Sequence, residues 1–261
     1  MTTGLTASGL VRTYGSRGLL ARFRRSDAVR AVDGVDVDLR QGQRLGIVGE
    51  SGSGKSTLMR LLLGLEAPDQ GTVVLDGREV RAGADLAWFR RRVQFVPQDP
   101  SSSLNPHLRI RDCVREPLQC LGITGDHGAR ILECLDAVGL DPSLADRYPG
   151  ELSGGQRQRV AIARALAPKP EVIVADEAVS ALDALVRLQV MTTLREICDT
   201  EQVSLIFISH DLGAVCFLCD SVMVMSRGRV VEAGAVPALF EAPAAPETRA
   251  LVSSVPVQPG V

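Results

Sequence analysis

Short apolar stretches alternate with longer amphipathic ones along this chain. The segment at residues 5–14 is predicted to form a strand, and near-alternating apolar and polar positions at 28–39 predict one or two more. Runs with a continuous apolar centre predict buried strands of the kind found in parallel sheets. These runs lie at residues 44–48, 93–96, 171–177 and 203–208. Because helical patterns separate them, we expect an α/β fold with a mixed sheet.

Turn residues predict antiparallel hairpins at the edge of this sheet. Asp76-Gly77 follows an expected strand at residues 72–75. Arg227-Gly228 lies in the middle of a second hairpin close to the end of the chain. The Ala- and Pro-rich segment beyond Gly234 predicts a short helix and a loosely held end.

The segment at residues 49–57 fits the phosphate-binding pattern of glycine, four free positions, glycine, lysine and serine or threonine. A strand precedes it and a helix follows, with no polar spacer of the kind that a Gly/Ser-rich linker has. Glycines let backbone N–H groups point inward at phosphate oxygens, and the helix directs its positive end at the same anion. The expected nucleotide-binding residues are Gly49, Glu50, Ser51, Gly52, Ser53, Gly54, Lys55, Ser56 and Thr57.

Two side chains of this loop carry specific chemistry. Lys55 is expected to reach the β- and γ-phosphates, and the Ser56 hydroxyl to ligate Mg²⁺. The chain has 29 Lys and Arg residues in all, but its lysines are only Lys55 and Lys169. A lysine in so arginine-rich a sequence is consistent with a requirement that arginine cannot meet.

An acidic pair, Asp176 and Glu177, ends the buried strand at residues 171–177. Open α/β sheets bind ligands at the carboxyl ends of their strands. Asp176 is therefore expected to hold Mg²⁺ or its water, and Glu177 to take a proton from the attacking water. The alternative is an acidic pair that caps the next helix.

Two further candidates lie at the ends of expected elements. His210 follows the strand at 203–208 and could donate a hydrogen bond to a γ-phosphate, or cap the next helix. A serine and two glycines open a helix near residue 154, which makes either a second anion-binding terminus or an ordinary cap. That string is Leu152, Ser153, Gly154, Gly155 and Gln156.

The N-terminal part offers one aromatic and one charged candidate. Tyr14 lies just upstream of the core strands and could stack on an adenine ring or pack at a sheet edge. The segment at 15–27 carries Arg22, Arg24 and Arg25. It is either a solvated loop or a contact for anionic lipid headgroups.

Composition narrows the function classes. A chain of 261 residues that is 45% hydrophobic can bury a substantial core. A net charge of −2 provides no bulk basic field for nucleic acid, and 3% aromatic residues leave little for stacking on single-stranded bases. No apolar run has a membrane-spanning length and no secretory signal is visible, so a cytosolic location is expected.

The chain has six cysteines, and two of them have the spacing of a redox or metal pair. These two, Cys216 and Cys219, fall in an expected helix, with no second Cys/His pair at zinc spacing. Buried, inert thiols are the expected state.

These motifs, in this order, resemble the ATP-binding cassette of ABC transporters from Tyr14 to about Pro256. The string at 152–156 is the most specific part, since it stands between a phosphate loop and an acidic strand. The resemblance implies a P-loop NTPase (RecA-like) core with an antiparallel β edge and an inserted α-helical subdomain. It implies one domain over 1–261, made of a core at 1–98 and 167–233, a helical subdomain at 99–166 and a tail at 234–261.

Carried over residue by residue, the resemblance gives each motif a role. Residues 49–57 match the Walker A loop and 172–176 the Walker B strand, so Ser56, Gln98 and Asp176 are implied as Mg²⁺ ligands. Glu177 matches the catalytic glutamate and His210 the switch histidine. Gln98 matches the Q-loop residue, which links Mg²⁺ and the attacking water to the membrane partner.

Other positions match the family less directly. Tyr14 matches the aromatic that stacks on adenine, and Ala178 stands where the family usually has proline, which should loosen the turn modestly. The D-loop is matched by Ser180, Ala181, Leu182 and Asp183. In the family the string at 152–156 completes the nucleotide site of another subunit, so two ATP molecules are expected between two cassettes, homo- or heterodimeric.

Further segments are similar to the oligopeptide, dipeptide and nickel importer ATPases. They lie at residues 98–106, 116–118, 176–183, 246–251 and 255–256. The resemblance implies an ATPase subunit, peripheral on the cytoplasmic face of the inner membrane, that works with permease subunits and indirectly with an extracytoplasmic solute-binding protein. The absence of a Cys-rich tail looks more like the nickel or metallophore type.

Three alternatives stay open from the sequence. One is an ABC exporter cassette. Another is a soluble cassette that acts on nucleic acid or ribosomes, although the coiled-coil or zinc insertions typical of those relatives are not seen. The third is a P-loop kinase, in which the string at 152–156 would have no role.

Overall fold

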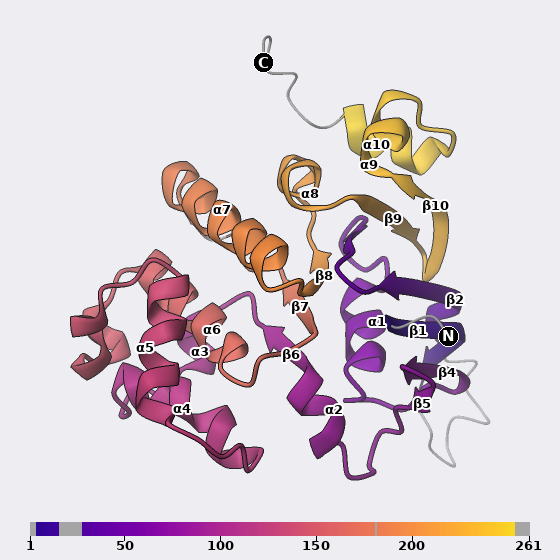
Figure 1. The fold of residues 1–261 in the computed structure, drawn as a ribbon. Coiled ribbons are helices and arrows are strands. Elements are labelled where there is room, and N and C mark those ends of the chain that lie inside the picture. Colours follow the sequence, from indigo (N-terminus) through magenta and orange to yellow (C-terminus); the bar gives the residue numbers. More distant parts are fainter. Residues whose placement is uncertain (1–3, 16–27, 181, 254–261) are drawn as a thin grey trace. The chain divides into compact units, whose positions relative to one another are not determined.

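A computed structural model describes residues 4–15, 28–180 and 182–253 (Figure 1). These residues form two compact units. The first unit holds residues 4–15, 28–40, 47–86 and 221–253, and the second holds 41–46, 87–180 and 182–220. The strand β3 (Arg44–Val48) runs from the second unit into the first.

An antiparallel sheet of four strands, in the order β2-β1-β4-β5, forms much of the first unit. Leu5 and Leu39 face each other across the first pair of strands and are fully buried, because alternate side chains of each strand point to one face. The strands are β1 (Gly4–Tyr14), β2 (Val29–Arg40), β4 (Gln70–Leu75) and β5 (Arg78–Glu79). Asp76-Gly77 joins the last two, as the sequence predicted.

The remaining elements of the first unit are a helix and the C-terminal segment. The helix α1 (Lys55–Leu62) follows the glycine-rich loop and buries Leu58, Leu61 and Leu62. A hairpin of β9 (Ser221–Ser226) and β10 (Arg229–Ala235) carries two short helices beside β10, α9 (Val236–Glu241) and α10 (Pro246–Ser253) (Figure 1).

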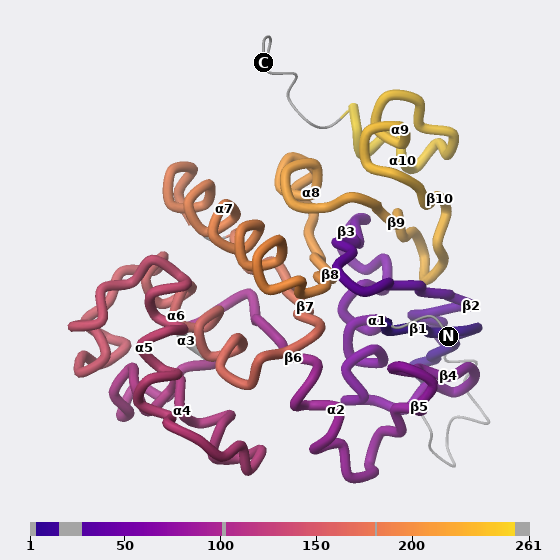
Figure 2. Tube along the Cα trace, in the orientation of Figure 1, coloured from indigo at the N-terminus to yellow at the C-terminus, as the bar shows by residue number. Residues whose placement is uncertain are grey.

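Three parallel strands organise the second unit, in the order β8-β7-β6 (Figure 2). They are β6 (Val93–Val96), β7 (Val172–Asp176) and β8 (Ser204–Ile208). The central strand β7 buries every residue from Val172 to Ala175, which explains why it is apolar without alternation. The strands run in the same direction, so the residues after their carboxyl ends meet at one edge.

Helices make up the rest of the second unit. The amphipathic helix α6 packs on α4 and α5, while α7 and α8 contact each other (Figure 1). The α-helices are α2 (Ala87–Arg92), α3 (Pro100–Ser103), α4 (Ile110–Cys120), α5 (His127–Ala137), α6 (Gly154–Leu166), α7 (Ala184–Thr200) and α8 (Leu212–Leu218). Two short 3-10 helices, η2 (Pro142–Asp146) and η3 (Pro149–Glu151), precede α6.

Several sequence predictions can be compared with these elements. The segment at 28–39, for which one or two strands were expected, forms one, and the C-terminal segment forms two short helices where one was expected. The helix α2 was missed because it buries only Phe89, so it has no apolar stripe to recognise. The arginines of the segment 15–27 lie outside the described residues. Among the described residues, no helix is both long enough and apolar enough to cross a bilayer.

The expectation that Cys216 is buried is wrong. Cys216 is exposed because the inward face of α8 is occupied by Leu212, Val215 and Leu218, whereas Cys219 at the end of that helix is buried. Burial raises the pKa of the Cys198 thiol to about 12. No cluster of three or more His, Cys, Asp or Glu side chains that could hold a metal occurs within residues 4–15, 28–180 and 182–253.

Thiol labelling with an aromatic disulfide at neutral pH is expected to modify Cys120 and Cys216 quickly, because these two are exposed. Burial raises the pKa of Cys216, so it should react more slowly than Cys120. The other four thiols are buried and should react only after unfolding. Cys120→Ser and Cys216→Ser should each lower the number of rapidly reacting thiols per chain by one. Fast labelling that survives in the double variant would contradict the burial described here.

Candidate nucleotide-hydrolysing site

Two positions of the glycine-rich loop in the first unit have room for glycine only. A Cβ atom on Gly49, at φ 153°, would lie 2.2 Å from the Met225 carbonyl oxygen. A Cβ atom on Gly54, at φ 107°, would lie 2.1 Å from the Ala31 carbonyl oxygen. The backbone of this loop is therefore in direct contact with its neighbours at both glycines.

Lys55 points back into the loop. Its Nζ atom donates to the carbonyl oxygens of Gly49 at 2.7 Å and Glu50 at 2.9 Å, and lies 3.4 Å from Ser53 Oγ. The residue is only 9% exposed, so a positive charge is held beside the loop with backbone oxygens as its partners. A phosphate group entering the loop would meet an ammonium group that is already oriented. Ser56, in the first turn of α1, is exposed.

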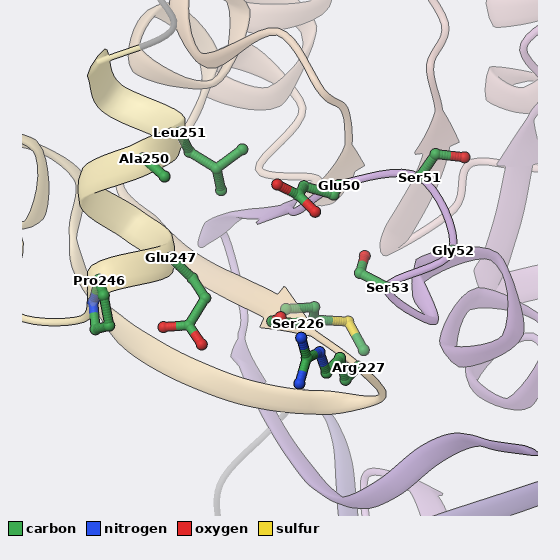
Figure 3. Close-up of a pocket in the computed structure, with 11 residues that line it drawn as sticks. Glu50, Ser51, Gly52, Ser53, Ser226, Arg227, Pro246, Glu247, Ala250 and Leu251 are labelled. Carbon is green, nitrogen blue, oxygen red and sulfur yellow. The ribbon is translucent and has the colours of Figure 1, made fainter.

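A hollow of about 420 Å³ lies beside the loop within the first unit. Figure 3 shows Ser53 on one side of the hollow and Glu247 of α10 on the other, with Ser226 and Arg227 between them. The loop is therefore bordered by the β9–β10 hairpin as well as by its own helix.

Tyr14 has a polar and a cationic partner. Its hydroxyl donates to Glu66 Oε2 at 2.5 Å, and the Arg12 guanidinium lies 5.2 Å from the ring centroid. The hydrogen bond from Tyr14 is the main reason why the pKa of Glu66 is lowered. The ring is 39% exposed at the end of β1, so packing at the sheet edge is observed, and stacking on adenine stays a prediction.

Three sequence-predicted residues meet at the carboxyl edge of the parallel strands in the second unit. Gln98 follows β6, Glu177 follows β7 and His210 follows β8. Gln98 Nε2 donates to Glu177 Oε2 at 2.8 Å, and His210 Nδ1 lies 2.9 Å from Glu177 Oε1. Parallel pairing of the strands thus brings together side chains that are far apart in the sequence.

The backbone aims Glu177 at this edge. Its φ of 44° is unusual for a residue with a side chain, and its N–H group donates to the Ile208 carbonyl oxygen at 2.8 Å. The next two residues, Ala178 and Val179, are 2% exposed. The Glu177 side chain itself is 21% exposed, so it is open to water although its backbone is fixed. The alternative prediction, that the acidic pair caps the next helix, is wrong, because the N-cap of α7 is Asp183.

The serine of the string at 152–156 is the N-cap of α6. Ser153 Oγ accepts from the Gln156 N–H group at 3.3 Å, and Gln156 Oε1 accepts from the Ser153 N–H group at 2.9 Å. Ser153 and Gly154 are exposed, whereas Leu152 and Gly155 are buried. The string is a capping box, and it also leaves an exposed helix N-terminus that can accept an anion from outside.

Gly155 and Gln158 explain how α6 is held within the second unit. A Cβ atom on Gly155 would lie 2.2 Å from Val186 Cγ1 of α7, so only glycine allows this approach. Gln158 is 1% exposed, and its Nε2 donates to the Pro97 carbonyl oxygen at 3.4 Å, next to Gln98. Sequence reasoning missed Gln158, although a polar residue on the apolar face of α6 was the signal.

The expected D-loop forms the turn between Glu177 and α7. Ser180 Oγ donates to the Glu177 carbonyl oxygen at 3.0 Å, and Asp183 accepts from the Val186 N–H group at 3.0 Å. Leu182 is half-buried, and Ala181 lies outside the described residues. This turn therefore starts at Glu177 and ends at the N-cap of α7.

Comparison with known proteins decides the family. The family model described as ABC transporter matches residues 32–180, which include the glycine-rich loop, Gln98, Ser153 and Glu177. The chain belongs to the ABC transporter family.

Two relatives of this ABC chain come from bacteria. The oligopeptide transport ATP-binding protein OppD of Mycobacterium tuberculosis is 45% identical over 95% of this chain and 41% of its own length. The dipeptide transport ATP-binding protein DppF of Lactococcus lactis subsp. cremoris is 41% identical over 88% of this chain and 76% of its own length.

Solved structures give the ABC fold independently. The ATP-binding cassette MJ0796, solved as a dimer in a post-hydrolysis state with ADP and phosphate, is 28% identical. The TM-score is 0.77, over 89% of this chain and 98% of that one. The predicted α/β P-loop NTPase fold is therefore confirmed, and the chain is an ABC ATPase.

Proposed function

We propose that this ABC ATPase energises an importer, and that peptides are its cargo. The observation that carries the catalytic part is the Glu177 carboxylate, held between Gln98 and His210 at 2.8 and 2.9 Å. A carboxylate that is exposed to water, fixed by its backbone and flanked by two polar side chains suits a general base.

In the proposed reaction Glu177 accepts a proton from the water that attacks the γ-phosphorus atom of ATP. Each carboxylate oxygen has one hydrogen-bond partner, Gln98 or His210, and its remaining lone pair can accept a hydrogen bond from the entering water. His210 is 62% exposed and can turn to donate a hydrogen bond to the γ-phosphate. Lys55 and the N–H groups of its loop hold the phosphates.

We also propose that Mg²⁺ acts with ATP in this chain. Asp176 is half-buried at the end of β7, and Gln98 donates through Nε2, which leaves its Oε1 atom as a ligand. The Ser56 hydroxyl is exposed. Carboxylate, carboxamide and hydroxyl oxygens are the donors that this ion prefers, so the residues fit it, and Ser56, Gln98 and Asp176 are the proposed ligands. Bound Mg²⁺ would neutralise charge on the transferred phosphoryl group.

In the proposed importer this chain works with a second cassette and with a permease. The N-terminus of α6 is exposed at Ser153 and Gly154, which supports binding of the γ-phosphate held by a facing cassette. That cassette can be a second copy of this chain or a related one. The proposed location is the cytoplasmic face of the inner membrane, with an extracytoplasmic binding protein delivering the cargo.

Peptide cargo is favoured over nickel or a metal chelate because the relatives compared above are named for oligopeptide and dipeptide transport. Deletion of the gene in its own host should abolish uptake of a labelled peptide mixture and leave nickel uptake unchanged. A plasmid copy should restore uptake, while a Glu177→Gln copy should not. Loss of nickel uptake with normal peptide uptake would contradict the cargo, and export of peptide would contradict the direction.

A further inference from the structure

The turn between β9 and β10 makes two backbone hydrogen bonds outside its own hairpin. The Gly228 N–H group donates to the Ser53 carbonyl oxygen of the glycine-rich loop at 2.9 Å. The Gly228 carbonyl oxygen accepts from the Asp33 N–H group of β2 at 2.8 Å. One residue thus joins the loop to a strand of the antiparallel sheet.

These three segments touch through their backbones. A Cβ atom on Gly228 would lie 2.8 Å from the Arg30 carbonyl oxygen and 3.0 Å from that of Ala31. A Cβ atom on Gly54 would meet the same Ala31 oxygen, and would lie 3.4 Å from Gly228 Cα. No methyl group fits at either glycine.

Ion pairs fasten the turn to β2. Arg229, directly after the turn, donates through Nη2 at 2.6 Å and through Nε at 2.8 Å to Asp33 Oδ2. Arg30 donates to the other oxygen of Asp33 at 2.8 Å. The Asp33 side chain is 15% exposed, and its pKa is lowered mainly by the hydrogen bond from Arg229.

A second hairpin turn of two residues, between β4 and β5, shows that this contact is not a general property of such turns. Asp76-Gly77 has φ values of 48° and 80°, and Arg227-Gly228 has 48° and 81°. A Cβ atom on Gly77, however, would meet nothing within 4 Å. The two turns have the same backbone form, but only Gly228 has close neighbours.

We propose that the β9–β10 turn braces the glycine-rich loop for ATP, with Gly228 as the positioning residue. The inference rests on the proposed ATPase function. In a trans peptide the C=O and N–H groups point in opposite directions. Gly228 holds the Ser53 C=O group toward the turn, so the N–H group of the same peptide unit, which belongs to Gly54, is directed away from it. That donor is thereby oriented for a phosphate oxygen before ATP arrives.

Gly228→Ala and Gly77→Ala form a matched pair, because both put a side chain at nearly the same φ and only the first disturbs the loop. Equilibrium binding of Mg–ATP should show a Kd that rises about three- to tenfold for Gly228→Ala and less than about twofold for Gly77→Ala. KM for hydrolysis should follow Kd, and kcat at saturating ATP should change less than about twofold.

A second pair, Asp33→Ala and Asp38→Ala, serves if Gly228→Ala does not fold. Asp33 holds the turn, whereas Asp38 forms an exposed ion pair with Arg40 on the same strand. Only Asp33→Ala should raise the Kd for ATP. If the two variants of each pair bind ATP with the same Kd while the unaltered chain binds ATP normally, the proposed brace is wrong. The proposed ATPase function is not affected by that result. An unaltered chain that does not bind ATP would overturn the proposed function, and the brace with it.

Discussion

Replacement of Glu177 by glutamine is expected to lower the rate of ATP hydrolysis by about 10²- to 10⁴-fold, which is the usual contribution of a general base. Glutamine has almost the same shape as glutamate, but it cannot accept a proton from the attacking water. The loop that holds the phosphates is unaltered, so the Kd for ATP should change little. Phosphate release at saturating Mg–ATP, measured beside equilibrium ATP binding, checks both statements.

The same substitution at the opposite end of β7 is the control. Glu171 lies just before this strand and pairs with Arg92 at the surface, away from Gln98 and His210. Glu171→Gln should retain hydrolysis within about twofold, because exposed ion pairs contribute little to stability. A Glu177→Gln chain that hydrolyses ATP at the unaltered rate would show that another group takes the proton.

The Lys55→Ala variant is expected to weaken ATP binding by about one to two orders of magnitude, since charge-assisted hydrogen bonds contribute about 1.5–3 kcal/mol each. The ammonium group already points into the loop, with its Nζ atom 2.7 Å from the Gly49 carbonyl oxygen. Removal of this charge takes away the cation that the loop itself offers to the phosphates. Titration with a fluorescent ATP analogue, with competition by unlabelled ATP, measures the loss.

Lys169 provides the matched control for Lys55, because it is the only other lysine of the chain and is exposed. Lys169→Ala changes the net charge of the protein by the same amount and should leave the Kd for ATP unchanged. Lys55→Arg should bind ATP almost as poorly as Lys55→Ala, because a planar guanidinium cannot occupy the narrow position of the ammonium group. Normal binding by Lys55→Ala would show that the loop does not need this cation.

The parts of the fold that follow from local pattern were predictable. The apolar runs predicted β6, β7 and β8, and two-residue turns predicted the β4–β5 and β9–β10 hairpins. Both signals depend on only a few neighbouring residues, so they can be recognised in the sequence. The meeting of Gln98, Glu177 and His210 was also foreseeable once each was seen to follow a parallel strand. The helix α2 and the exposure of Cys216 were missed, because each depends on which side of a helix the rest of the unit covers.

Contacts between distant segments could not be predicted from the sequence. Gln158 supports the chain beside Gln98, and Gly228 supports Ser53, but no local pattern in the sequence indicates either contact. The partners of Tyr14 are a similar case, because Glu66 becomes its neighbour only through the tertiary fold. Sequence reasoning thus identified residues with evident chemistry and missed those that position them.

The central claim is that ATP held by the glycine-rich loop of one cassette is clamped by the Ser153 end of α6 in another. The most direct measurement is the mass in solution of the Glu177→Gln chain with Mg–ATP, with its companion cassette present if the pair is heteromeric. Adding Ser153→Arg should abolish the ATP-dependent pair and spare binding by the single chain, whereas Ser143→Arg, an exposed serine in the same unit, should leave the pair intact. An ATP-dependent pair that persists with Ser153→Arg would contradict the claim.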